Sequence, residues 1–153
     1  MKQSNNYKHI IWDWNGTLID DAWLCADIMS ELLSAHGLSL MDKERYKETF
    51  EFPISAFYNT LGFEEKLFDA ISKEFTKTYD AKKNQVKLHN SVKTILELFT
   101  KNNINHSILS ASHQTILDES ILHFKLGGFF KNIVGVQNSF AAGKDIKGME
   151  LIN

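Results

Sequence analysis

The stretch IIWDWNGTL, residues 10–18, joins a run of apolar side chains to a polar loop that contains a glycine. A short apolar run bounded by such a loop is typical of a buried strand, here His9 to Trp12. The change of character at Asp13 marks the end of that strand. A strand buried on both sides implies a sheet that is covered on both faces, so we expect an α/β protein.

The residues after this stretch predict a long helical segment. Apolar residues recur at helical spacing between a cap at Asp20 or Asp21 and a stop at Gly37, and the lone Cys25 in this helix is expected to serve packing. From residue 38 to residue 85 no strand is expected. Three further helices are predicted there, at 42–51, 54–61 and 63–83, with Pro53 as the break.

The second half of the chain alternates between helices and strands. A helix capped at Ser91 leads to an apolar strand at 105–109, and a helix at 113–124 leads to a third strand near 132–136. Such alternation predicts a Rossmann-like parallel sheet with right-handed crossovers. The long helical insertion is then a cap over the carboxyl ends of the strands. We expect a core at residues 1–19 and 86–153, and a cap at residues 20–85.

Three polar residues follow the three predicted strands. Asp13 follows the first, Ser110 the second and Lys144 the third. Because the carboxyl ends of parallel strands meet at one edge, these side chains are expected to converge. A carboxylate that attacks phosphorus, with a hydroxyl and an ammonium group that stabilise the phosphoryl oxygens, suits phosphoryl transfer. Ser112 is an alternative to Ser110.

Composition narrows the function classes. The chain has 153 residues, of which 43% are hydrophobic and 24% charged, and its net charge is -2. The absence of a basic stripe argues against nucleic-acid binding. No stretch is apolar enough for a membrane span or a signal peptide, and a single cysteine cannot form an internal disulfide. We therefore expect a cytoplasmic protein of about one domain.

Residues 10–18 closely resemble the first motif of the haloacid dehalogenase superfamily, an apolar strand followed by D-x-D-G-T-L. Ser110 resembles the second motif and Lys144, in the sequence Ala-Gly-Lys, the third. The helical insertion resembles the cap of the phosphoglycolate-phosphatase-like branch. The resemblance runs from about residue 8 to the last residue.

The resemblance implies a hydrolase, a phosphatase that acts on a small phosphorylated metabolite. Asp13 is then the nucleophile that forms an aspartyl-phosphate, and Thr17 braces the loop. Lys144 neutralises developing charge, and Mg²⁺ is held by the Asp13 carboxylate and the backbone carbonyl of Asn15. The implied phosphate contacts are Asn15, Gly16, Ser110, Ala111 and Lys144.

The chain departs from the family pattern in two ways. The family phosphatases have an acidic residue where this chain has Asn15, and an amide cannot pass a proton to the leaving group. The family also places acidic metal ligands after a further strand, whereas only Asp145 and Glu150 follow Lys144. We therefore expect weak Mg²⁺ binding, a core whose last strands are missing through truncation, and a homo-oligomer that covers the exposed edge.

Two alternatives stay open at this point. The first is a catalytically silent module that keeps the fold and binds a partner or a phosphorylated metabolite. The second is a dehalogenase-type hydrolase in which Asp13 attacks carbon, a reaction that needs neither an acid at residue 15 nor magnesium.

Overall fold

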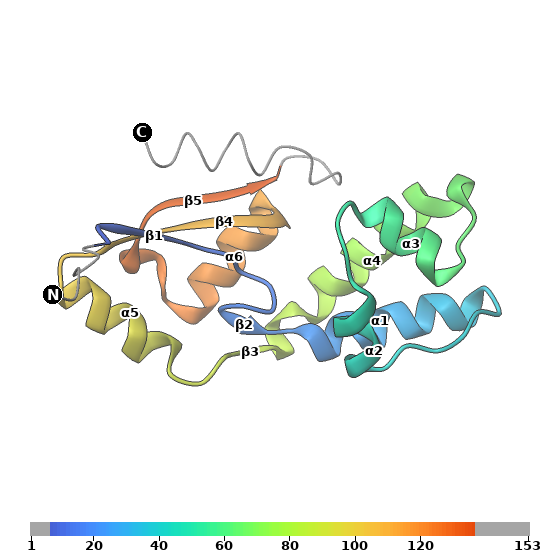
Figure 1. The fold of residues 1–153 in the computed structure, drawn as a ribbon, viewed down its shortest axis with the longest axis horizontal. Coiled ribbons are helices and arrows are strands. Elements are labelled where there is room, and N and C mark those ends of the chain that lie inside the picture. Colours follow the sequence, from blue (N-terminus) through green and yellow to red (C-terminus); the bar gives the residue numbers. More distant parts are fainter. Residues whose placement is uncertain (1–6, 137–153) are drawn as a thin grey trace, which may run out of the picture.

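The computed structural model describes residues 7–136 and is built on a three-stranded parallel sheet (Figure 1). The strands are β1 (His9–Trp12), β4 (Asn105–His113) and β5 (Phe130–Val136), and their order across the sheet is β1-β4-β5. In the register of the sheet, Ile108 of β4 pairs with Trp12 on one side and with Ile133 on the other. The expected α/β fold with a parallel sheet is confirmed.

Two helices connect the strands. Helix α5 (Val92–Lys101) precedes β4, and α6 (Gln114–Phe124) leads through the short 3-10 helix η3 (Gly127–Phe129) to β5. Both crossovers advance in the same direction across the sheet, so right-handed connections place both helices on one face. Figure 1 draws both below the strands.

The strands differ from the sequence prediction in burial and length. All four residues of β1 are half-buried rather than buried, because within residues 7–136 this strand pairs only with β4. β4 continues beyond Leu109 to His113, so the polar residues expected in a loop extend the strand. The predicted cap at Ser91 is wrong in its chemistry: Ser91 precedes α5 with φ of 68°, and its side chain makes no capping hydrogen bond.

The segment between β1 and β4 is mainly helical, and its residues 38–85 contain no strand, as predicted. Its first helix begins after Asp21 and ends before Gly37, which takes the left-handed conformation with φ of 68°. No helix among residues 7–136 is long and apolar enough to cross a membrane. The elements are α1 (Ala22–Ala35), α2 (Lys43–Thr49), α3 (Ile54–Leu61), η1 (Glu65–Leu67), α4 (Phe68–Lys82) and η2 (Lys83–Gln85).

A small antiparallel ribbon connects the sheet to the helical segment, and the sequence patterns did not predict it. It consists of β2 (Ile19–Asp20) and β3 (Lys87–Leu88), two residues each, which are too short to carry a periodic signal. The chain thus leaves the sheet region and returns to it through adjacent strands. Beside this ribbon, buried Lys83 makes ion pairs with Asp80 and with Glu119 of α6, the latter at 2.8 Å.

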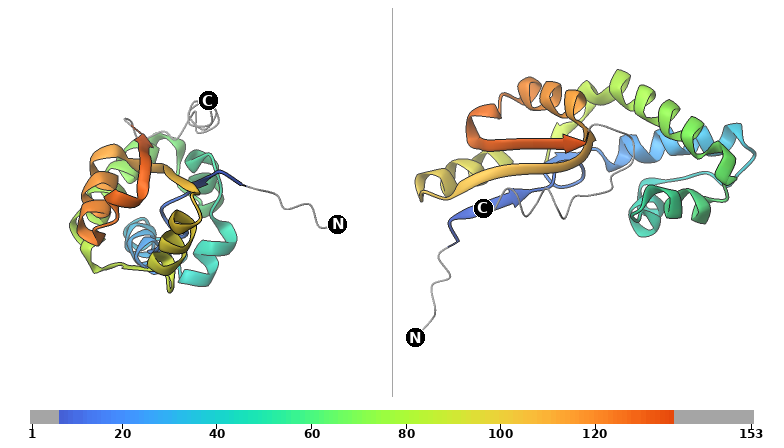
Figure 2. Two further views of the ribbon diagram at one scale, coloured as in Figure 1. Left: turned by 90° about the vertical axis from the view of Figure 1, so that its left-hand side faces the viewer. Right: turned by 90° about the horizontal axis from the view of Figure 1, so that it is seen from above.

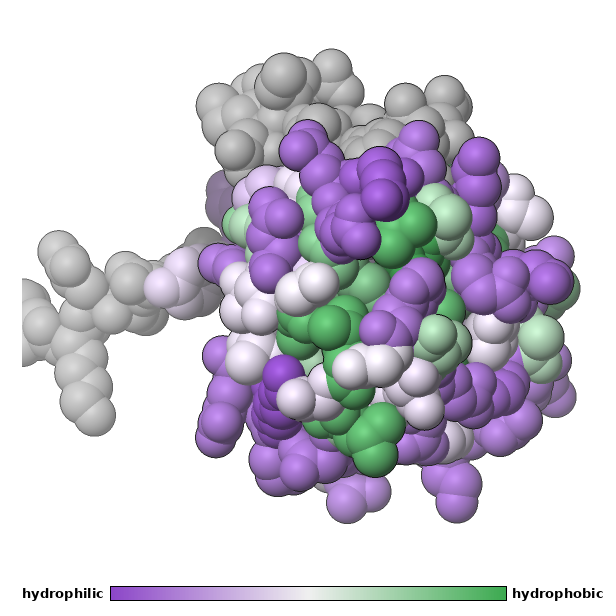
Figure 3. All heavy atoms as spheres, turned by 90° about the vertical axis from the view of Figure 1, so that its right-hand side faces the viewer, coloured by the Kyte–Doolittle hydropathy of each residue, from purple (hydrophilic) through white to green (hydrophobic). Residues whose placement is uncertain are grey.

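The apolar side chains form two clusters. One packs α5 and α6 against the sheet around Ile108, and the other fills the space between α1, α3 and α4 around Phe57. Figure 2 shows the sheet region and the helical segment lying end to end. Figure 3 views the molecule from its helical end, where hydrophobic side chains are visible between hydrophilic ones. Helices α1 to α4 lie beyond the carboxyl ends of the strands, so the space between them and the sheet adjoins the loop after β1.

Candidate active site

The loop after β1 is wound around one backbone carbonyl. The amides of Thr17, Leu18 and Ile19 all donate to the carbonyl of Trp14, at 3.3, 2.9 and 3.2 Å. Trp14 is buried and anchors the loop in the core, while Gly16 supplies the positive φ of 69° that the turn requires. Asp13 immediately precedes this turn, is half-buried and lines a cavity of about 560 Å³.

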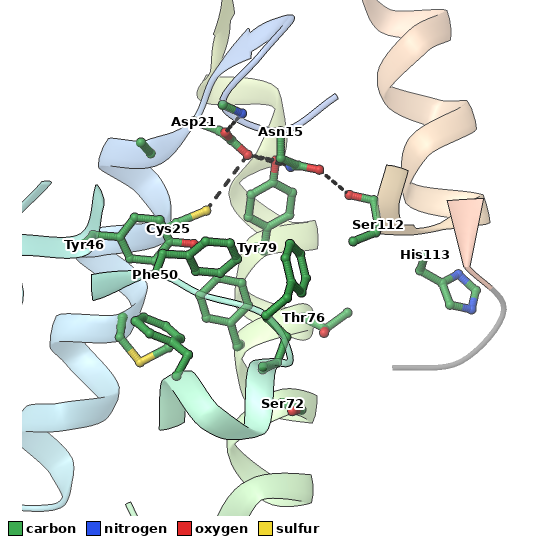
Figure 4. Close-up of a pocket in the computed structure, with 18 of the residues that line it drawn as sticks. Asn15, Asp21, Cys25, Tyr46, Phe50, Ser72, Thr76, Tyr79, Ser112 and His113 are labelled. Atoms are coloured by element: carbon green, nitrogen blue, oxygen red, sulfur yellow. Dashed lines mark hydrogen bonds between the residues drawn. The ribbon is translucent and has the colours of Figure 1, made fainter. Parts of the chain in front are cut away.

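The amide of Asn15 lies at the centre of a hydrogen-bond network (Figure 4). Its Nδ2 donates to Oδ2 of Asp21 at 2.6 Å and to the hydroxyl of Tyr79 at 3.0 Å. Its Oδ1 accepts from Oγ of Ser112 at 2.6 Å. Three segments are therefore joined by one side chain that must donate on one side and accept on the other. An amide meets this requirement, whereas a carboxylate only accepts.

Asp21 corrects the sequence prediction that it caps a helix. It stands at the N-cap position of α1, but its side chain makes no capping hydrogen bond. Instead this buried carboxylate accepts from the amide of Gly16 at 2.8 Å, from Asn15, and from the hydroxyl of Tyr79 at 2.7 Å. The thiol of Cys25 is a fourth donor, at 3.9 Å, and together these donors compensate for the burial of the charge. The other cap candidate, Asp20, pairs with Lys43 at 3.2 Å.

Two neighbours of Asp21 hold their protons more tightly than usual. Burial, followed by the charge of Asp21, raises the pKa of the Tyr79 hydroxyl well above its ordinary value, so Tyr79 stays a hydrogen-bond donor. Burial, again with Asp21 as the second cause, also raises the pKa of the Cys25 thiol. Cys25 is therefore a protonated, buried thiol that packs in α1, as the sequence suggested.

The two serines after Leu109 lie at different depths. Ser110 is buried; its Oγ accepts from the amide of Ser112 at 3.0 Å and donates to Oδ1 of Asn15 at 3.4 Å. Ser112 is half-buried and, with Ala111, lines the cavity that Asp13 also lines. Of these two serines, Ser112 lines the cavity, the alternative left open by the sequence, while Ser110 accepts a hydrogen bond from the backbone amide of Ser112.

The position of Ser112 depends on a close approach of β5. A Cβ atom on Gly135 would lie 2.7 Å from the carbonyl oxygen of Ser112 and 2.9 Å from the Cα of Gln114. The amide of Gly135 donates to the side-chain oxygen of Gln114 at 2.6 Å. A glycine at this point lets the two strands bring Ser112 against Asn15.

The remaining predicted site residues are Gly16 and Thr17, which the structure describes, and Lys144, which it does not. Gly16 lines the cavity, whereas Thr17 is exposed and does not line it. Thr17 contributes its backbone amide to the turn. Lys144 lies outside the described residues, as do Asp145 and Glu150.

The described residues do not fit a complete magnesium site. Mg²⁺ requires about six oxygen ligands in octahedral geometry. Within residues 7–136 no group of three or more His, Cys, Asp or Glu side chains could hold a metal ion. Apart from Asp13, the carboxylate that lines the cavity is that of Asp21, and both of its oxygens already accept hydrogen bonds.

The cavity has a polar end and an aromatic end. The polar end contains Asp13 and the network around Asn15, at the carboxyl ends of β1 and β4. The rest of the wall comes mainly from the helical segment. Its aromatic members are Tyr46, Phe50, Phe52, Phe57, Tyr58, Phe75 and Tyr79.

Sequence reasoning missed Asp21, Tyr79 and the part played by Ser112. Asp21 follows Asn15 by six residues, so its proximity could have been inferred from the tight turn at Gly16. Tyr79 lies 64 residues beyond Asn15, and no spacing signal connects them.

Solved structures share this fold over nearly the whole chain. A predicted phosphatase of Clostridium acetobutylicum superposes with a TM-score of 0.81 at 18% identity, covering 96% of this chain and 71% of that one. A haloacid dehalogenase-like hydrolase of Streptococcus pneumoniae gives 0.78 at 16%, with coverages of 95% and 69%. A predicted phosphoglycolate phosphatase of Haemophilus somnus gives 0.69 at 16%, with coverages of 88% and 64%.

No curated protein matches the chain in sequence. A family model does match, and it covers residues 10–146, which include the loop after β1, the helical segment and both later strands. The chain therefore belongs to the haloacid dehalogenase-like hydrolases.

Proposed function

We propose that this protein is a phosphatase that cleaves phosphate monoesters through Asp13. The observation that carries the proposal is the position of Asp13: it directly follows β1, precedes a tightly wound turn and lines a cavity between the sheet and the helical segment. Membership of the hydrolase family, and phosphatase descriptions among structural neighbours, support the same chemistry.

In the proposed reaction a carboxylate oxygen of Asp13 attacks phosphorus, and the bond from phosphorus to the ester oxygen breaks. The ester oxygen leaves with the electron pair. Water then attacks the phosphorus of the aspartyl-phosphate, which releases inorganic phosphate and regenerates Asp13. The hydroxyl of Ser112, which donates to Asn15 in this structure, is the group that would turn to a phosphoryl oxygen, whereas the amide of Gly16 is engaged by Asp21. Ser110, Ala111 and Lys144 keep the phosphate contacts that the resemblance implies, and Thr17 braces the loop. Magnesium has no role in these steps, because the residues that the structure describes do not form a complete magnesium site.

The helical segment is proposed to act as the cap predicted for residues 20–85. The proposed substrate is a small phosphorylated molecule. A homo-oligomer and a cytoplasmic location stay predictions from the sequence.

The test compares hydrolysis of p-nitrophenyl phosphate by the purified chain with hydrolysis by its Asp13→Asn variant, with added Mg²⁺. Loss of a nucleophile is expected to lower the rate by about 10³-fold or more. Circular dichroism of both proteins is the control for folding. Equal rates from two folded proteins would contradict the proposal and favour a binding module.

A second candidate, displacement of halide from carbon, is favoured by one observation. The amide of Asn15 makes hydrogen bonds through both its nitrogen and its oxygen and has no acidic proton to transfer to a leaving group. A halide leaves without taking a proton. Release of chloride from a 2-chloro acid in the presence of a chelator, dependent on Asp13, would identify this activity. Absence of such release in a protein that hydrolyses phosphate esters would exclude it.

A further inference from the structure

The helical wall of the cavity has few charges. Among the lining residues that the structure describes, Lys47 is the only lysine and none is an arginine. Phe50 and Phe75 are half-buried and Phe52 is 51% exposed, so ring faces remain accessible on this side. Against the seven aromatic rings, this wall offers the ammonium group of Lys47 and the hydroxyls of Ser72 and Thr76, so a sugar or a dicarboxylate would lose more of its hydration than these groups replace, which is costly. An apolar group of moderate size would replace water at an aromatic surface.

The polar end restricts the leaving group in a different way. Asn15 has no acidic proton, and its amide is fixed between Asp21 and Ser112. The hydroxyl of Tyr79 already donates to Asp21, whose two oxygens accept from four donors. Figure 4 shows His113, another lining residue, on the far side of Ser112 from Asn15. The described network thus offers no acid at the position of Asn15.

An ester that needs no acid has a weakly basic leaving group. A phenol ionises near pH 10, as tyrosine does, whereas an alcohol, like water, holds its proton far more tightly. A phenolate can leave unprotonated, but an alkoxide departs slowly without a general acid, whose help is worth about 10²–10⁴-fold.

We propose that the cavity takes aryl phosphate monoesters, with the ring against the aromatic wall and the phosphoryl group at Asp13. This inference rests on the proposed function and names its substrate class. A bond forms between an oxygen of Asp13 and phosphorus while the bond from phosphorus to the aryl oxygen breaks. The electron pair leaves on the phenolate, which takes a proton from water, and a second water hydrolyses the aspartyl-phosphate. A cavity of about 560 Å³ has room for one such ester.

The kinetic test uses phenyl phosphate and cyclohexyl phosphate, which have the same number of carbon atoms but leaving groups of different basicity, together with glucose 6-phosphate. We expect kcat/KM for phenyl phosphate to exceed that for either alkyl ester by about 100-fold or more. Asp13-dependent hydrolysis of all three at similar rates would overturn the aryl assignment and leave the phosphatase proposal intact.

The binding test does not require turnover. Phenylphosphonate and methylphosphonate, which cannot be hydrolysed, are titrated calorimetrically into the full chain. The phenyl compound is expected to bind at least about 10-fold more tightly, because it buries a ring. Phe52→Ala is expected to reduce this preference by about 3- to 10-fold. The matched control is Leu122→Ala, at a residue of α6 that is 76% exposed and does not line the cavity.

The outcomes separate the two proposals. Equal affinity for the two phosphonates would overturn the aryl assignment. Preference for the phenyl compound without Asp13-dependent hydrolysis of any ester would support the aryl site and contradict the phosphatase proposal.

Discussion

Different interactions stabilise the two ends of the cavity. At the polar end, Asn15, Asp21, Tyr79 and Ser112 form directional hydrogen bonds of 2.6–3.0 Å. At the aromatic end, rings such as Phe50 and Phe57 pack at centroid distances near 5.2 Å, and no single atom pair decides the arrangement. Removing one polar partner leaves a buried group unsatisfied, whereas ring packing tolerates change wherever the ring is exposed. The polar end is therefore suited to orienting a reaction, and the aromatic end to accepting a range of ring shapes.

The aromatic end itself contains fully buried rings, such as Phe57, and half-exposed rings, such as Phe52, which packs edge-on against Phe50. Phe57 is 1% exposed, so Phe57→Ala is expected to lower the free energy of unfolding by about 3–5 kcal/mol. Phe52 is 51% exposed, and Phe52→Ala is expected to change the free energy of unfolding by less than about 0.5 kcal/mol. Urea denaturation measures both. Equal losses would show that the wall is one packed unit.

At the polar end, Asn15→Asp is expected to be strongly destabilising rather than activating. It places a second carboxylate where Nδ2 now lies 2.6 Å from Asp21. Repulsion is expected to cost about 3 kcal/mol at neutral pH. The cost should shrink as the pH falls, because one carboxyl group then gains a proton and restores the hydrogen bond.

The double variant Asn15→Asp/Asp21→Asn is the matched control, since it exchanges the carboxylate and the amide. It is expected to recover at least half of the lost stability and to accelerate cleavage of cyclohexyl phosphate, because residue 15 then carries a carboxyl group. A double variant as unstable as the single one would contradict the account of the network.

A smaller effect is expected from the hydroxyl of Tyr79. Tyr79→Phe removes a donor to the buried carboxylate of Asp21 and is expected to cost about 1–3 kcal/mol in thermal or urea unfolding. Tyr58→Phe is the comparison, because the hydroxyl of Tyr58 accepts a longer bond of 3.3 Å from Ser72 and touches no charge. Similar losses in the two variants would show that the charge of Asp21 adds nothing.

The smallest effect concerns a buried polar residue in the sheet. His106 accepts from the indole of Trp12 at 3.1 Å, and burial, with His9 as a further cause, lowers its pKa. The unfolded chain therefore binds a proton that the folded chain does not. Stability is expected to fall as the pH drops below about 6.5, by at most about 1.4 kcal/mol per pH unit.

Urea denaturation between pH 5 and pH 7.5 measures this slope. His106→Gln is expected to flatten it, whereas His123→Gln, at an exposed residue, is expected to retain it. A slope unchanged by His106→Gln would assign the pH dependence to other groups.

Local patterns in the sequence determined much of the fold. The apolar run before Asp13, the helical spacing after Asp21, the break at Pro53 and the later alternation of helix and strand predicted the elements to within a few residues. These signals are local, because a helix or strand reports its periodicity within its own length. The motif at residues 10–18 likewise predicted the family that the family model confirmed.

Only the tertiary structure decided the chemistry of the cavity. Asp21, which was predicted as a helix cap, accepts four hydrogen bonds instead. Tyr79 and Ser112 lie on the two sides of Asn15. Ile19 pairs with Leu88 in a ribbon too short to predict. The physical reason is that a hydrogen bond or a ring contact forms between residues that are adjacent in space, and the distance along the chain, 64 residues from Asn15 to Tyr79 and 97 to Ser112, leaves no periodic trace of that adjacency.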